Sequence, residues 1–151
     1  MTTTSVTSTH TSDHERARRA VVPVGIATLL IATACSFEGR NSTGEWVFEL
    51  GLQVVAAAVI FGLVVPRGLR HESAGGRALA MAAIGALLVA PAFWLGLPFQ
   101  LGAAAALLGY AGKRAGTGSG MSIASLVLGV LTMVFYLAIY IGDYMSMHGI
   151  G

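Results

Sequence analysis

The sequence predicts an all-α integral membrane bundle of five transmembrane helices, and three observations support this fold class. Of the 151 residues, 55% are hydrophobic and only 11% are charged, whereas an ordinary soluble domain carries about 25% charged residues. The mean hydropathy is +0.74. The apolar residues also form long runs, and about 20 helical residues cross a hydrocarbon core of about 30 Å. This pattern excludes a soluble globular domain, a disordered chain, a disulfide scaffold and a coiled coil.

The first predicted span covers about residues 20–37 and follows a Ser/Thr-rich segment. Residues 1–19 contain almost no side chain that could bury surface, so we predict a disordered cytoplasmic tail there. Pro23 falls in the first turn of the span, where its missing N–H costs little.

The second predicted span covers about 46–65 and ends at Pro66, because a proline inside a helical pattern usually ends or kinks the helix. Residues 66–77 contain three arginines and are predicted to form a basic loop.

The next 35 residues, 78–112, carry no charge. As one helix they would be about 52 Å long, which exceeds the thickness of the hydrocarbon core, so they must fold back. Glycine and proline in Gly96-Leu97-Pro98 mark the break. We therefore predict a third span at about 78–95 and a short fourth span at about 99–112.

The fifth predicted span covers about 121–142, so the transmembrane bundle comprises 20–143 and a short outer tail comprises 144–151. The positive-inside rule orients the bundle. With five spans, one side holds eight basic and three acidic residues, net +5, and the other holds one basic and four acidic residues, net −3. The N-terminus is therefore predicted inside and the C-terminus outside.

Small residues recur at helical spacing along the last three predicted spans. Such residues let helix backbones approach closely, where van der Waals contact holds membrane helices together. The pattern predicts packing within one bundle, and the alternative is a homo-oligomer formed through one of these faces. The faces comprise Ala78, Ala82, Ala86 and Ala90 in the third span, Gly102 and Gly109 in the fourth, and Ser125 and Gly129 in the fifth.

Glu45, Glu49 and Gln53 are spaced by four residues and share one face of the second span. Gln53 is the one amide that we place clearly within a span, whereas the two glutamates lie at the helix start, where the dipole favours negative charge. We interpret the three as an interfacial helix start with one interhelical hydrogen bond. The alternative is a site for a cation or polar solute. No His/Cys/Asp/Glu cluster has metal-ligand spacing, and no cofactor is predicted.

Cys35 is the single cysteine, and it follows the small residues Ala32, Thr33 and Ala34. We interpret it as a small buried thiol in an uncleaved first span. The alternative is a bacterial lipoprotein processing site, which would leave a lipidated Cys35 outside and four remaining spans.

From Arg77 the chain contains RALAMAAIGALLVA and then AAAALLGYAGKRAGTGSGMSIASLVLGVL. Over about 77–142 it resembles a family of small, Ala/Gly-rich, multi-pass membrane domains of unknown function from bacteria of the actinobacterial type. The first helix departs from the family pattern, because it lacks the LVLG ending. The resemblance implies a location in the bacterial cytoplasmic membrane and no known activity. The matching residues are Gly109, Gly112, Lys113, Arg114, Gly118, Gly120, Met121, Ile123, Ala124 and Gly129.

No enzyme motif occurs in the sequence, since G-x-S-x-G, a Walker loop and H-E-x-x-H are all missing. The basic residues are scattered rather than gathered on one face, so we expect no nucleic-acid partner. The expected partners are the lipid bilayer, a second copy or another membrane protein. The sequence thus favours a non-catalytic structural or accessory membrane component. The alternative is a small oligomeric transporter or channel for ions or small solutes.

Overall fold

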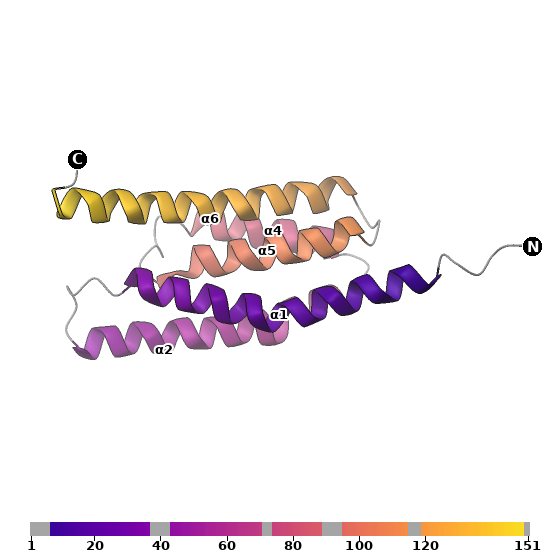
Figure 1. Ribbon diagram of the computed structural model, residues 1–151, viewed down its shortest axis with the longest axis horizontal. Helices are drawn as coiled ribbons and strands as arrows, with labels where there is room; N and C mark the ends of the chain where they lie inside the picture. The colour runs from indigo at the N-terminus through magenta and orange to yellow at the C-terminus, as the bar shows by residue number, and fades with distance from the viewer. Residues whose placement is uncertain (1–6, 37–42, 71–73, 89–94, 115–118, 150–151) are drawn as a thin grey trace, which may run out of the picture.

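The described part of the chain is entirely helical. The computed structural model describes residues 7–36, 43–70, 74–88, 95–114 and 119–149. Its helices run alternately up and down, and the two termini lie at opposite ends of the bundle (Figure 1). The helices are α1 (Thr7–Ser36), α2 (Thr43–Val59), the π-helical turn η1 (Ile60–Val64), α3 (Val65–Leu69), α4 (Ala74–Leu87), α5 (Leu97–Arg114) and α6 (Ser119–Met147).

Three helical segments are long and apolar enough to cross a membrane: Arg18–Cys35, Gly44–Leu69 and Gly120–Met147. They correspond to the first, second and fifth predicted spans. The other two predicted spans correspond to α4 and α5. Helix α4 is shorter than these three segments, and α5 is less apolar. With 14 residues, α4 is about 21 Å long and is shorter than the hydrocarbon core.

Helix α1 begins at Thr7 and so includes most of the segment for which the sequence predicts a disordered tail (1–19). Extending an existing helix avoids the cost of nucleation, and an exposed ion pair between Glu15 and Arg19, at 3.6 Å, bridges one turn. Pro23 consequently lies deep inside the helix rather than in its first turn. Figure 1 shows α1 changing direction about midway along its length, as expected where a proline removes a backbone hydrogen bond.

The second helix does not end at Pro66, contrary to the prediction. Residues 60–64 widen into a π-helical turn in which the Val65 N–H donates to the Ile60 carbonyl. This wider turn accommodates the proline, which cannot donate a hydrogen bond and would crowd the preceding turn of an α-helix. The helix therefore continues as α3 to Leu69, and much of the predicted 66–77 loop belongs to helix ends.

The predicted third span (78–95) and the structure also differ, because α4 starts at Ala74 and ends at Leu87. The remainder of that span includes residues 89–94, which are outside the described part. Gly96 adopts a positive φ of 62°, which favours glycine. This residue immediately precedes α5, so the break predicted at Gly96-Leu97-Pro98 coincides with a turn into the next helix.

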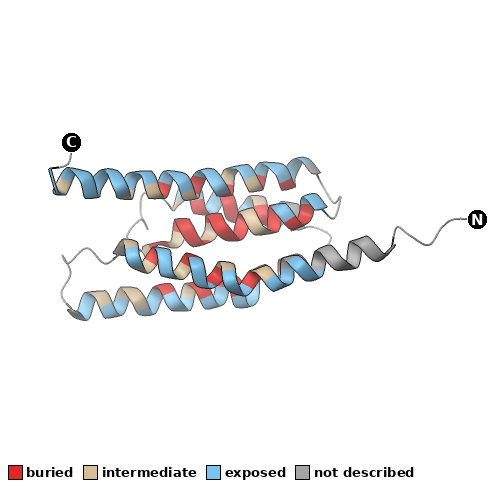
Figure 2. Ribbon diagram, in the orientation of Figure 1, coloured by how far each residue is buried: buried red, intermediate tan, exposed pale blue. Residues whose placement is uncertain are grey.

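Helix α5 lies at the centre of the bundle and packs against α6, α4 and α1. Figure 2 shows buried residues along much of α5, whereas α1, α2 and α6 are largely exposed. A helix that is shielded by its neighbours does not need an apolar outer surface. This explains why α5 is built from alanine and glycine and is not among the three long apolar segments.

Helices α5 and α6 pack in near-backbone contact through their small residues. A Cβ atom added to Gly109 would lie 2.5 Å from Ser125 Oγ, and one added to Gly129 would lie 2.5 Å from the Gly102 carbonyl oxygen. Real Cβ atoms do not approach other atoms this closely. The small-residue faces of the fourth and fifth predicted spans therefore meet each other within the chain.

The predicted alanine stripe of α4 is buried over only part of its length. Ala78 and Ala82 are fully buried, and a Cβ added to Gly85 would lie 3.1 Å from Leu101 Cβ on α5. Ala86 is exposed, which corrects its assignment to the packing face. Gly85 makes the contact with α5 in its place. Ala90 lies outside the described residues.

Candidate functional site

Two buried glutamines meet between α2 and α5. Gln53 is 1% exposed and Gln100 is 0% exposed. Gln100 Nε2 donates a hydrogen bond to the backbone carbonyl of Gln53 at 3.4 Å. The Thr33 hydroxyl of α1 donates to Gln53 Oε1 at 3.3 Å. Side chains from three helices thus form one polar cluster in an otherwise apolar interior, and we refer to Thr33, Gln53 and Gln100 as the amide cluster.

The Gln100 carboxamide oxygen has no hydrogen-bond partner among the described residues although it is buried. Buried hydroxyls of α6, in contrast, are satisfied by their own helix. Ser125, for example, donates to the Ser122 carbonyl, and Thr132 donates to the Leu128 carbonyl. Leaving a buried acceptor unsatisfied costs about 1–3 kcal/mol. The amide cluster therefore offers a free acceptor to a water molecule, a cation or a polar solute.

The turn before α5 closes tightly against this cluster. A Cβ added to Gly96 would lie 2.7 Å from Ala32 Cβ and 3.8 Å from Gln53 Cδ. Only glycine tolerates both this approach and the positive φ at this position. The backbone at Gly96 is thereby held against α1 and α2, beside Gln53.

An aromatic pair connects α5 and α6 next to Gln100 in the sequence. The Phe99 and Tyr136 rings are 5.6 Å apart and tilted by 41°, and both are almost fully buried. Edge-tilted geometry of this kind is favourable for aromatic rings. Cys35, in the last turn of α1, is a partly buried thiol.

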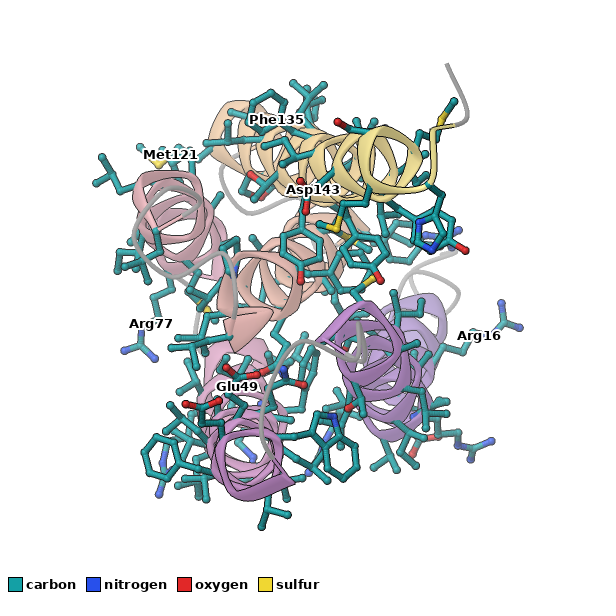
Figure 3. The ribbon with its side chains drawn as sticks, turned by 90° about the vertical axis from the view of Figure 1, so that its left-hand side faces the viewer. Arg16, Glu49, Arg77, Met121, Phe135 and Asp143 are labelled. Carbon is teal, nitrogen blue, oxygen red and sulfur yellow. The ribbon has the colours of Figure 1, made fainter. Side chains whose placement is uncertain are left out.

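The three residues that the sequence places on one face of the second span differ in burial. Glu45 is exposed in the first turn of α2, Glu49 is half-buried and Gln53 is fully buried. Figure 3, viewed along the bundle, shows Glu49 directed toward the space between α2 and α5. The polar face thus leads from solvent toward the amide cluster.

The sequence-based prediction missed Gln100 and Thr33. Gln100 stands two residues after Pro98, near the start of the predicted fourth span, and no role was predicted for it. The sequence feature that could have identified Gln100 is that its side chain is the one carboxamide in the uncharged stretch 78–112. Pairing it with Gln53 requires knowing that α5 packs beside α2.

The described residues contain no group of three or more His, Cys, Asp and Glu side chains placed to hold a metal ion. The buried polar side chains of the described residues carry hydroxyls or carboxamides: Thr28, Gln53, Gln100, Ser122, Ser125 and Thr132. These groups can donate and accept hydrogen bonds. Compared with family models, curated proteins and solved structures, the chain gives no match.

Proposed function

We propose that this chain is a five-span protein of the bacterial cytoplasmic membrane, with its N-terminus inside and its C-terminus outside. The observation that supports it most is the separation of charge along the bundle. The ends of α3 and α5 and the start of α4 carry arginine or lysine at the end of the bundle nearest the N-terminus (Figure 1). Glu45, Glu49 and Asp143 lie at the opposite end. Positive charge is retained on the cytoplasmic side of membrane proteins.

We further propose a non-catalytic role, as a structural or accessory component that acts through helix–helix or loop contacts. Proton relays and catalytic acids within membranes use ionisable side chains. The buried polar groups of the described part are hydroxyls and amides, none of which changes charge near neutral pH. The close packing of α5 on α6 also favours a rigid bundle.

Impermeant maleimide labelling tests the orientation. Single cysteines are introduced in a Cys35→Ser background, one within each of the segments 37–42, 71–73 and 115–118, and one at Leu97, in the predicted break between the third and fourth spans. We expect labelling in intact cells at 37–42 and at position 97, and labelling only after lysis at 71–73 and 115–118. Labelling at 115–118 in intact cells, or labelling at position 97 only after lysis, would remove the five-span arrangement.

A second candidate function is a small transporter or channel, and the unsatisfied Gln100 oxygen is the observation that favours it. Copurification in mild detergent and liposome flux separate the two roles. For the accessory role we expect a second copy or another membrane protein at fixed stoichiometry, and solute flux equal to that of empty vesicles. Flux above empty vesicles that is lost in Gln100→Leu would replace the first role by the second. Repeated recovery of a lone monomer would also contradict the first.

A further inference from the structure

A groove with a volume of about 290 Å³ opens at the basic end of the bundle. Its wall on one side is the π-helical turn and α3, its opposite wall is the start of α4, and α5 contributes to its floor. The groove combines two arginines with apolar side chains. Its lining residues are Leu63, Val64, Arg67, Gly68, Arg77 and Leu108.

The shape of the groove depends on the π-helical turn and on Gly68. Leu63 and Val64 are the last two residues of that turn, which ends two positions before Pro66, and π-turns inside helices often occur at functional sites. A Cβ added to Gly68 would lie 2.9 Å from a methyl carbon of Leu108, so the missing side chain lets α3 approach α5. Leu108 is fully buried, whereas Leu63 and Val64 are exposed on the side that faces lipid in the proposed placement.

The two arginines come from opposite walls. Arg67 belongs to α3 and Arg77 to α4, and both are exposed. Figure 3 shows Arg77 reaching from α4 toward the side of the bundle where α2 lies. The ion pair between Glu15 and Arg19 involves neither of them. Guanidinium groups stay charged and match phosphate oxygens with two parallel N–H donors.

We propose that this groove binds the head-group phosphate of an anionic phospholipid, with an acyl chain lying along Leu63 and Val64. Basic pockets between transmembrane helices on the cytoplasmic side are suited to anionic lipid head groups. A zwitterionic phosphatidylcholine is disfavoured, because its choline would bring a further positive charge to two guanidinium groups. The inference rests on the proposed membrane placement, which puts the groove at the lipid head-group level.

Lipid titration of the purified full chain in mild detergent tests the site. Phosphatidylglycerol or phosphatidylcholine is added in mixed micelles, and thermal unfolding and native mass spectrometry report binding. We expect phosphatidylglycerol to bind and stabilise and phosphatidylcholine to do neither. Arg67→Gln/Arg77→Gln should weaken phosphatidylglycerol binding at least about tenfold, as expected from the loss of charge-assisted bonds. The control Arg16→Gln/Arg18→Gln removes the same charge outside the groove and should change binding by less than about threefold.

A steric variant keeps both arginines and so covers the case in which the double variant does not fold. Val64 is 40% exposed, and Val64→Trp should fill the groove and weaken phosphatidylglycerol binding. Val127→Trp on α6, where the native side chain is 48% exposed, should not. Inorganic phosphate at the same concentration should not stabilise the protein, because it lacks the acyl chain.

Several outcomes overturn the proposal. These are equal binding of the two lipids, equal losses in the two arginine variants, normal binding by Val64→Trp, and stabilisation by inorganic phosphate alone. The maleimide map is a separate readout. A reversed labelling map together with intact lipid selectivity contradicts the proposed orientation but not the lipid site. The expected labelling map without lipid selectivity contradicts the lipid site but not the orientation.

Discussion

Replacing Gly109 by leucine is expected to lower the free energy of unfolding by about 2–3 kcal/mol, the upper part of the range for overpacked cores. The first atom of the new side chain would lie 2.5 Å from Ser125 Oγ, 2.6 Å from the Ser122 carbonyl oxygen and 2.8 Å from the Leu126 nitrogen. Two of these atoms belong to the backbone of α6 and cannot rotate away. The two helices must therefore separate, and the contact that joins the last two helices is lost.

Thermal unfolding in one detergent measures this effect, with Gly142→Leu as the matched control. Gly142 also lies on α6, but nothing lies within 4 Å of a Cβ added there. The control should change the free energy of unfolding by less than about 1 kcal/mol, as is usual away from packed contacts. Equal losses in the two variants, or an unchanged Gly109→Leu protein, would contradict close packing of α5 on α6.

Gln100→Glu is expected to destabilise the protein by about 3 kcal/mol, the cost of placing a charged side chain at membrane depth. Gln100 is completely buried, and its amide nitrogen donates to the Gln53 carbonyl. The carboxylate loses this donor and places negative charge against a carbonyl oxygen.

Gln100→Leu is the matched variant and should change the free energy of unfolding by only about 1 kcal/mol. The variant loses a hydrogen bond, but it also removes the cost of burying a polar group, and the two effects nearly cancel. It loses the 3.4 Å bond to Gln53 but also removes the unsatisfied oxygen. Thermal unfolding of the two variants side by side gives the comparison. A loss in Gln100→Leu as large as that in Gln100→Glu would show that the oxygen has a bound partner in the folded protein.

The structure also explains why α5 differs from a typical membrane helix. Its buried residues include Gly102, Gly109 and Leu108, and it packs against α1, α4 and α6. The helices around it carry large apolar residues that are exposed; Figure 3 shows Phe135 of α6 pointing away from the bundle. The central position of α5 thus allows it to have a low hydropathy.

The sequence by itself determined the all-helical class, the number of helical runs and the break at Gly96. These properties depend on composition along the chain, because an apolar run avoids water wherever its neighbours lie. It also identified Gly102, Gly109, Ser125 and Gly129 as contact residues, since close helix approach requires small side chains at helical spacing. The helix ends were predicted less accurately, because α1 begins as early as Thr7 and the helix that contains Pro66 continues to Leu69.

Only the tertiary structure decided which polar residues meet. Gln53 and Gln100 are 47 positions apart, and Arg67 and Arg77 were assigned to one loop although they form opposite walls of a groove. Such pairs depend on which helix faces turn toward each other. That choice is made by the packing of many small contacts between helices, chiefly those of α5, and no local pattern in the chain records it.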